Sequence, residues 1–213
     1  MNFPSGGAAS SPQDEPEPES SLADNDEASD VALMLRVRDG DLEAFETLVT
    51  RHQHSVVGTA AKMLGGAADA EDIGQQVFVR VWKHAARYQP SAKFTTWLMT
   101  ITRNLVFNEL RRRRRSQQVS MDADEGDTIR HQFVDEQAAA PSEEMLDSEL
   151  HEAIDAAIAS LPEAQRLAIV LRRYEGMPYE EIAEVLKTSV PAVKSILFRA
   201  RAELKARLKK YLE

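Results

Sequence analysis

The sequence contains no cysteine, which excludes disulfide bonds and every metal site built on thiolates. It also lacks any run close to the roughly 18 apolar residues that a membrane-spanning helix needs. Residues 1–30 hold no Lys or Arg and no apolar segment, so they lack the pattern of an export signal. We therefore expect a soluble protein of the reducing cytoplasm, with no membrane insertion.

Catalytic and metal-binding patterns are missing as well. The five histidines are scattered, and the spacing of His52 and His54 does not suit one face of a helix. There is no glycine-rich phosphate loop and no nucleophile elbow. The carboxylates gather in acidic runs, which are more often solvated surfaces than acid–base pairs. We predict no catalytic residue, no metal site and no cofactor, so the chain is not expected to be an enzyme.

Charge is distributed unevenly along the 213 residues, whose formal net charge is −9. Residues 1–30 carry −8, residues 31–117 carry +6, residues 118–160 carry −11 and residues 161–213 carry +4. Two basic blocks are thus preceded and separated by acidic segments. This asymmetry indicates that the basic blocks face nucleic acid or another anionic surface, although the average charge is acidic.

Helical periodicity without a strand pattern predicts an all-α protein, in which an acidic flexible linker joins two small helical domains. The predicted parts are a disordered acidic arm (residues 1–30), a helical domain (31–115), the linker (116–142) and a helix-turn-helix domain (143–213). The inner stripe of a helix over about 69–87 is expected to contain Val77, Phe78, Val81 and Trp82.

Local signals mark the expected ends of helices. Asp41 is a good N-cap residue, and Gly65-Gly66 marks a turn. Ser160 and Glu163 have the spacing of a capping box, in which each side chain would cap a backbone N–H of the other residue. Ser189 is the expected N-cap of a long last helix.

The strongest local signal lies near the C-terminus. A short helix over 178–187, a turn of about three residues and a basic helix over 190–212 make a helix-turn-helix. The second helix of such a motif enters the major groove of DNA, and Lys194, Ser195 and Arg199 lie off its apolar stripe. An ordinary helical hairpin with a solvated charged face is the alternative.

Residues 87–115 are a second candidate for nucleic-acid binding. Cations alternate there with aromatic rings, which can stack on unpaired bases while the cations hold the backbone. The cations are Arg87, Lys93, Arg103 and Arg111–Arg115, and the rings are Tyr88, Phe94, Trp97 and Phe107. The polar face of a helix from about residue 95 contains Thr100, Arg103, Asn104, Phe107, Asn108 and Arg111. The alternatives are that Phe94 and Trp97 belong to the core and that the arginines are a solvated helix end.

Four segments then occur in an order that is typical of one family. They are GDLEAFETLVTRHQHSVV (40–57), AEDIGQQVFVRVWKHAARYQP (70–90), KFTTWLMTITRNLVFNELRRRRR (93–115) and LPEAQRLAIVLRRYEGMPYEEIAEVLKTSVPAVKSILFRARAEL (161–204). With the acidic segment between the last two, the chain resembles bacterial RNA polymerase sigma factors of the extracytoplasmic-function (ECF) type. These are the compact class with only sigma regions two and four. The resemblance covers about residues 31–213.

The resemblance implies a subunit that binds core RNA polymerase, directs it to promoters by reading the minus-ten and minus-thirty-five elements, and assists DNA melting. The implied core-binding residues are Asp72, Gln75, Gln76, Val79, Arg80 and Lys83. The implied minus-ten residues are Tyr88, Lys93, Phe94, Arg103, Asn104, Asn108 and Arg111. The implied minus-thirty-five residues are Ser189, Ala192, Lys194, Ser195 and Arg199.

The implied partners are core RNA polymerase and promoter DNA, and an anti-sigma factor is left open as a further one. The free chain is expected to be monomeric, and the acidic linker to run through basic channels of the polymerase. A stand-alone helix-turn-helix regulator, whose first domain binds an effector or dimerises, is the alternative function. It accounts for residues 161–213 equally well but gives no reason for Arg103, Asn104, Asn108 and the arginine run. A nucleic-acid enzyme is disfavoured because no nucleophile or metal-ligand set is present.

Three positions differ from the family pattern. Gln76 follows Gln75 where the family usually has a glutamate, and Gly74 precedes both inside the expected helix. Ile196 stands where an arginine is frequent in the recognition helix. Lys187 stands at the turn of the helix-turn-helix, where a glycine is common.

Overall fold

The computed structural model describes residues 19–123 and 143–211, with side chains described for 29–118 and 149–211. Within these residues every regular element is helical, which confirms the all-α prediction. The elements are α1 (Glu19–Arg38), α2 (Leu42–Leu64), α3 (Ala67–His84), η1 (Ala85–Arg87), α4 (Phe94–Ala123), α5 (Glu143–Ala159), α6 (Glu163–Arg173), α7 (Tyr179–Leu186), α8 (Val190–Arg207) and η2 (Lys209–Tyr211). Among the described helices, none combines the length and apolar character that crossing a membrane requires.

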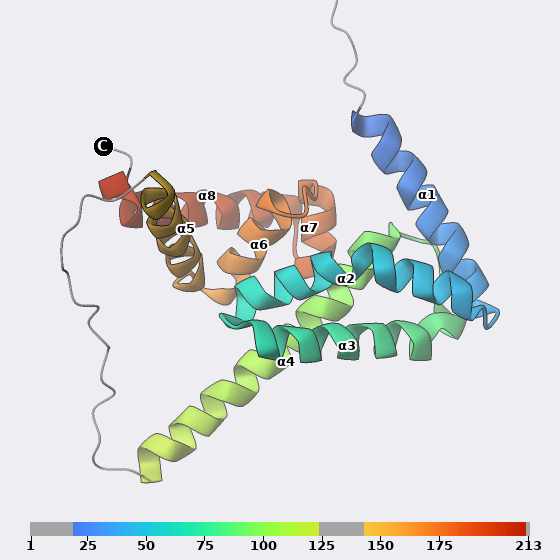
Figure 1. The fold of residues 1–213 in the computed structure, drawn as a ribbon, viewed down its shortest axis with the longest axis horizontal. Coiled ribbons are helices and arrows are strands. Elements are labelled where there is room, and N and C mark those ends of the chain that lie inside the picture. The colour runs from blue at the N-terminus through green and yellow to red at the C-terminus, as the bar shows by residue number, and fades with distance from the viewer. Residues whose placement is uncertain (1–18, 124–142, 212–213) are drawn as a thin grey trace, which may run out of the picture.

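Helices α1 to α4 form the first domain. Figure 1 shows α2 and α3 side by side, with α4 crossing them and its second half projecting away from the other helices. The apolar faces of the four helices meet in a shared core, in which Met34, Leu48, Val77 and Leu98 are completely buried. Burial of these faces is the main source of stability, because short helices are marginal by themselves.

The ends of α2 agree with the sequence signals. The Asp41 side chain accepts a hydrogen bond of 3.0 Å from the Ala44 N–H, which confirms it as the N-cap. Gly65 ends the helix with a positive φ of 74°, a conformation that costs glycine little. The expected capping box at Ser160 is wrong. The Ser160 hydroxyl instead donates to the Ala157 carbonyl at 2.7 Å, because this carbonyl at the end of α5 has no helical N–H to accept from.

Helix α1 begins inside the arm that we expected to be disordered. Asp30, counted there as one of the solvated acids, is only 2% exposed. Its carboxylate pairs with Arg51 and lies 2.7 Å from His52 Nε2, both on α2. A buried carboxylate with two partners fixes the middle of α1 on α2, because burying it unpaired would be costly. Residues 1–18 lie outside the described residues.

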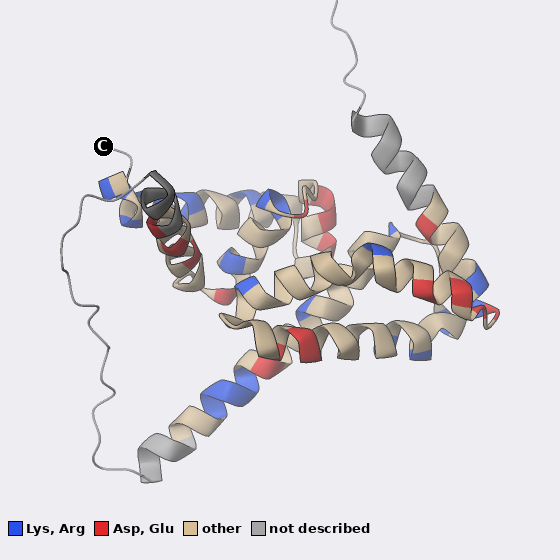
Figure 2. Cartoon of the chain, viewed as in Figure 1, with Lys and Arg blue, Asp and Glu red and all other residues tan. Residues whose placement is uncertain are grey.

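Helix α4 is longer than predicted. It continues through the arginine run to Ala123, although the linker was expected to begin at residue 116. Residues 124–142 of the expected linker lie outside the described part of the chain. The long helix carries a concentrated basic stretch along its projecting half (Figure 2).

Helices α5 to α8 form the second domain, in which α7 and α8 make the predicted helix-turn-helix. Ile182, Val193 and Leu197 pack at the elbow and are at most 1% exposed. Lys187 ends α7 with a φ of 56°, in the left-handed region that favours glycine. Ser189 caps α8 through its hydroxyl, which accepts from the Ala192 N–H at 3.4 Å.

The two domains pack directly on each other. Helices α5 and α6 contact α2, and α7 contacts α4. Arg166 of α6 donates to the Met63 carbonyl at the end of α2 (2.7 Å) and to the carbonyls of Ala159 and Leu161 in its own domain. Burial lowers the pKa of this guanidinium. The buried apolar residues of both domains belong to one continuous cluster.

Candidate functional site

The outer face of α3 brings the six predicted core-binding residues together. They are all exposed, and with His84 they line one shallow depression; they are Asp72, Gln75, Gln76, Val79, Arg80 and Lys83. The face exists because α3 turns Ile73, Val77 and Val81 toward the core, which leaves the intervening positions outside. Half of the Val79 side chain is exposed, so the face has an apolar centre with charged neighbours.

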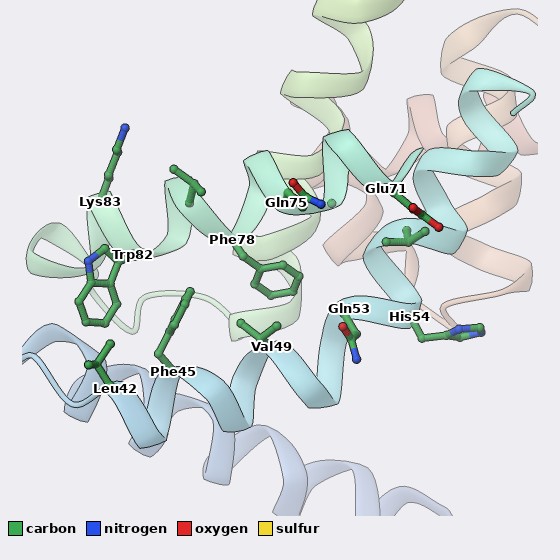
Figure 3. A pocket seen from close by; sticks show the side chains of 13 residues that line it. Leu42, Phe45, Val49, Gln53, His54, Glu71, Gln75, Phe78, Trp82 and Lys83 are labelled. Atoms are coloured by element: carbon green, nitrogen blue, oxygen red, sulfur yellow. The ribbon is translucent and has the colours of Figure 1, made fainter. Parts of the chain in front are cut away.

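An apolar groove between α2 and α3 adjoins this face and was not predicted. Its volume is about 940 Å³, and Figure 3 shows rings and aliphatic side chains of the two helices facing one another across it. The apolar lining includes Leu42, Phe45, Val49, Phe78 and Trp82. Leu42 is 61% exposed and Trp82 is 38% exposed. A cluster of large exposed apolar side chains at one place is typical of a surface that binds a partner.

Trp82 corrects the expected inner stripe of α3. Its ring does not enter the core but lies at the rim of the groove, tilted by 59° to the Phe45 ring, with 5.1 Å between the ring centroids. Val77 and Val81 already fill the interior beneath α3 and are completely buried. Trp82, the last residue of the expected stripe, therefore lies at the edge of the domain and not in its core.

Gly74 is explained by the packing of α3 on α2. A Cβ atom at this position would lie 2.7 Å from Cγ2 of Val57, closer than real side chains approach. The glycine thus lets the two helices come together beneath the groove, which offsets its low helix propensity. A glycine, which is a poor helix former, therefore stands at position 74 because the packing of α3 on α2 leaves no room for a side chain.

The loop between η1 and α4 corrects two of the predicted minus-ten residues. Tyr88 is 3% exposed and Phe94 is fully buried, so neither offers a ring face to a base in this structure. The Tyr88 ring lies 6.4 Å from Phe94 and 5.1 Å from Trp97, and the Phe94 ring lies 5.2 Å from His52. These rings anchor both ends of the loop. Phe94 therefore belongs to the core, which was the alternative interpretation of this residue. Lys93 remains exposed beside them.

The polar face of α4 is present as expected. Arg103 donates to the Asn104 side chain at 3.0 Å, and Arg111 donates to the Asn108 side chain at 2.9 Å. The Arg103 guanidinium lies over the Phe107 ring at 5.1 Å, and its buried Nε has no hydrogen-bond partner. Asn108 and Arg111 are exposed, whereas Arg103 and Asn104 are half-buried. Two amides and two guanidinium groups therefore follow one line along the helix.

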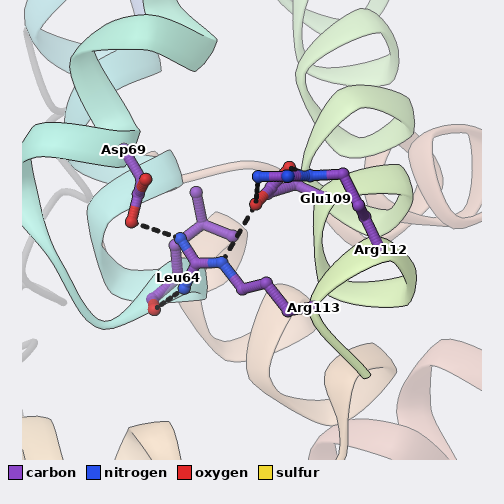
Figure 4. Close-up of polar contacts among 5 residues, drawn as sticks. All are labelled: Leu64, Asp69, Glu109, Arg112 and Arg113. Carbon is purple, nitrogen blue, oxygen red and sulfur yellow. Dashed lines mark hydrogen bonds and ion pairs between the residues drawn. The ribbon is translucent and has the colours of Figure 1, made fainter. Parts of the chain in front are cut away.

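Most of the arginine run is paired with acids. Arg112 and Arg113 both donate to Glu109, and Arg113 also pairs with Asp69 and donates to the Leu64 carbonyl at 3.0 Å (Figure 4). The hydrogen bond from Arg112 holds the pKa of Glu109 below its ordinary value, and Arg113 adds to this effect. Arg113 therefore ties α4 to the end of α2, which neither reading of the arginine run anticipated.

The start of α8 presents the predicted minus-thirty-five residues. Lys194, Ser195 and Arg199 are exposed together. Ser189 is committed to capping the helix, and Ala192 is half-buried. Phe198, which was not among the predicted residues, is 74% exposed and lies with Lys194, Ser195 and Arg199 around one shallow depression. The sequence could have indicated this exposure, because Phe198 lies off the buried stripe of Val193, Leu197 and Ala200.

Within the described residues, no cluster of three His, Asp or Glu side chains is placed to hold a metal ion. The predicted site residues instead lie on three exposed surfaces of the described residues. One is apolar and mixed in charge (α3 with the groove), one is polar and basic (α4), and one is basic with an exposed ring (α8).

Comparison with known families matches each domain separately. Residues 48–116 match the family model described as Sigma-70 region 2, and residues 151–204 match the one described as Sigma-70, region 4. The first match contains α3 and most of α4, and the second contains the helix-turn-helix. The three surfaces thus lie within or beside the matched segments.

Two curated relatives extend the match along most of the chain. The RNA polymerase sigma-H factor of Pseudomonas aeruginosa is 32% identical over 173 residues, which are 81% of this chain and 90% of the relative. The ECF RNA polymerase sigma-E factor of Escherichia coli K12 is 33% identical over 178 residues, which are 83% of this chain and 93% of the relative.

Two solved structures share the fold. CnrH, determined in complex with the cytosolic domain of CnrY, has a TM-score of 0.62 and 27% identity, and the match covers 85% of this chain and 97% of CnrH. The sigma factor RpoE of Bartonella quintana, determined in complex with the anti-sigma factor NepR, has a TM-score of 0.61 and 24% identity. That match covers 78% of this chain and 96% of RpoE.

Proposed function

Because this chain belongs to the family of ECF RNA polymerase sigma factors, we propose that it binds core RNA polymerase, directs it to promoters and assists DNA melting. The observation that supports this most strongly is the exposed outer face of α3 beside an apolar groove. A stand-alone helix-turn-helix regulator, whose first domain would bind an effector or dimerise, could also use a groove there, but it gives no reason for the polar face of α4 with Arg103, Asn104 and Asn108.

The polymerase surface consists of the outer face of α3 and the adjoining groove. Arg80 and Lys83 supply positive charge, Asp72 supplies negative charge, and Val79 supplies an apolar centre. Interfaces of this kind draw their affinity from a buried apolar centre and their orientation from the charged rim. A helix of the polymerase clamp is the partner that we assign to this surface.

The minus-ten surface consists of Lys93 and the polar face of α4. Arg103, Asn104, Asn108 and Arg111 would contact the DNA, and Tyr88 and Phe94 would hold the loop in place from below. Amides can bond to base edges, while guanidinium groups bond to phosphates or bases. The melting step requires capture of unstacked bases, which the loop at residues 89–93 and this face would share.

The minus-thirty-five surface consists of Lys194, Ser195 and Arg199 at the start of α8, with Phe198 added. An exposed ring on a recognition helix can pack against a thymine methyl group, while the cations bond to bases or phosphates. Ser189 and Ala192 would act mainly by shaping the first turn of the helix. Ile196 is half-buried, whereas Lys194, Ser195, Phe198 and Arg199 are exposed, so Ile196 has less access to DNA than they have.

An anti-sigma protein is the further partner that we propose. CnrH, which is 27% identical to this chain, was determined in complex with the cytosolic domain of CnrY. The apolar groove between α2 and α3 is large enough for the side chains of an amphipathic helix. A partner bound there would compete with core polymerase, and added core would then displace it.

The decisive experiment is reconstitution with core RNA polymerase. The wild-type chain should co-elute with core and support run-off transcription from a promoter selected out of a genomic library. Arg80→Glu should weaken association with core, whereas Arg38→Glu, a charge reversal at the end of α1, should not. Normal co-elution of Arg80→Glu would contradict the assignment of α3. Specific promoter binding without core would favour the stand-alone regulator.

A further inference from the structure

Asp30 is a buried acid that none of the three surfaces uses. One oxygen of its carboxylate accepts from Arg51, and the other lies 2.7 Å from Nε2 of His52. The His52 side chain is 12% exposed and that of Arg51 is 34% exposed, so the acid faces protein rather than solvent. Asp30 lies before the segment that matches Sigma-70 region 2, which begins at residue 48. A buried and fully paired acid of this kind holds its partners in one orientation.

The hydrogen bond between Asp30 and His52 orients the imidazole ring. An ionised carboxylate only accepts hydrogen bonds, so Nε2 of His52 is the donor. The imidazole is held with its centroid 5.2 Å from that of the Phe94 ring, and the two rings are tilted by 54°. Phe94 is fully buried and is the first residue of α4, so it determines where the loop after η1 ends. The position of this loop therefore depends on Asp30 through His52 and Phe94.

Helix α1 also contacts both elements that enclose the loop. It packs on η1, which precedes the loop, and on α4, which follows it. Asp30, Arg51 and His52 line one cavity of about 370 Å³ together with Lys93, the last residue of the loop. Lys93 Nζ pairs with Glu181 at 3.3 Å rather than with Asp30, whose two oxygens are each bonded to α2. The acid therefore acts on the loop by orienting its neighbours and not by pairing with its cation.

We propose that Asp30 is a positioning residue for the minus-ten surface, and that α1 thereby helps to determine which base the loop at residues 89–93 selects. The inference rests on the proposed function of that loop. Asp30 does not touch DNA itself, and its effect passes through His52 and Phe94 to the loop. Selection of one unstacked base needs a pocket wall held to within about 0.5 Å, which a fully paired buried network can provide.

A role in stability alone is the competing explanation. Removal of Asp30 leaves Arg51 and His52 without their acceptor, so a loss of stability is expected in either case. The ratio of the affinities for two DNA sequences separates the explanations, because a fraction of unfolded protein lowers both apparent affinities by the same factor. A positioning role changes this ratio, whereas a purely structural role leaves it unaltered.

The test uses the chain bound to core RNA polymerase and a promoter obtained by run-off selection. The probes are labelled single-stranded DNAs that carry its minus-ten sequence, with each base replaced in turn by the other three, and fluorescence anisotropy measures their binding. At the position where the wild type discriminates most, Asp30→Ala should reduce the discrimination by about threefold to tenfold. The control is Asp39→Ala, which removes an exposed acid just after α1 and should keep the wild-type ratio. Both variants should co-elute with core.

His52→Phe tests the same link while keeping a ring beside Phe94 and leaving Asp30 paired with Arg51. It should reduce the discrimination by about twofold or more, because no hydrogen bond fixes the new ring. Wild-type ratios in folded Asp30→Ala and His52→Phe would overturn the proposal, and if Asp30→Ala does not fold, the ratio of His52→Phe decides it. Absence of base discrimination in the wild-type complex would contradict the proposed function of the loop, and the inference with it.

Discussion

The two candidate surfaces with apolar character are built in different ways. The groove of the first domain needs side chains from both α2 and α3, so its shape depends on how closely the two helices approach at Gly74. The exposed patch of the second domain lies on α8 alone, and only the turn before it decides where it points. A surface shared by two helices is sensitive to packing changes far below it, whereas a surface on one helix is sensitive mainly to its own residues.

Arg166→Met should have the largest effect on stability, because this side chain joins the two domains that carry the two surfaces. The side chain bonds to three carbonyls, one of which ends α2 in the other domain. Loss of these charged hydrogen bonds should lower the free energy of unfolding by about 2–4 kcal/mol. Urea denaturation would measure the change, and Arg173→Met, at an exposed position of the same helix, is the control. Equal stabilities of the two variants would contradict the structural role of Arg166.

Gly74→Ala should disturb the two-helix surface specifically. The new Cβ would overlap Val57, so we expect a loss of about 1–3 kcal/mol and weaker binding to core polymerase. Thermal unfolding and co-elution with core would record the two effects. Gly58→Ala is the control, because a Cβ there meets no neighbour and alanine favours the helix. The double variant with Val57→Ala should recover part of the loss.

Phe198→Ala should disturb the one-helix surface without disturbing the fold. The ring is 74% exposed, so its removal should leave the melting temperature unchanged within about 1 °C. Affinity for duplex DNA carrying the upstream element should fall by about 1 kcal/mol, a factor of about five. Binding isotherms at fixed salt would measure this change. An unaltered affinity would remove Phe198 from the DNA surface.

Lys187→Gly should stabilise the turn that aims α8. The residue has a φ of 56°, where a side chain is strained and glycine is not. We expect a gain of about 0.5–1 kcal/mol in the free energy of unfolding. Lys187→Ala, which removes the charge but keeps a Cβ, should not give this gain. If both variants gain equally, the cause is charge rather than backbone strain.

The smallest effect concerns the pH dependence of the N-cap of α2. The backbone hydrogen bond from Ala44 and then the contact with Arg36 lower the pKa of Asp41. The carboxylate therefore stabilises the folded state fully above its ordinary pKa of 3.8, and this contribution is lost as the pH falls through the lowered value. Asp41→Asn keeps a capping oxygen but has no such acid dependence. Unfolding curves between neutral and acidic pH would compare the two proteins.

Periodicity predicted what a single helix determines. The outer face of α3, the polar face of α4 and the cations of α8 all follow from helical spacing, and the structure exposes them together. Periodicity did not predict Trp82 at the rim of the groove, because its exposure depends on the position of the first turn of α2, which carries Leu42 and Phe45. Tyr88 and Phe94 were assigned to DNA from composition, but their burial depends on contacts with His52 and Trp97 from other segments. Asp30 likewise looked solvated until its partners on α2 were known.

The contacts at the end of α2 have a further consequence for reversibility. This end is held by Arg113 of its own domain through the Leu64 carbonyl and by Arg166 of the other domain through Met63. If the domains part, α2 keeps the first clasp, and Arg166 keeps the carbonyls of Ala159 and Leu161. Both the end of α2 and the Arg166 guanidinium therefore keep hydrogen bonds within their own domains. After separation of the domains, the Leu64 carbonyl would still be bonded to Arg113, and Arg166 would still be bonded to carbonyls of its own domain. The end of α2 should therefore remain helical.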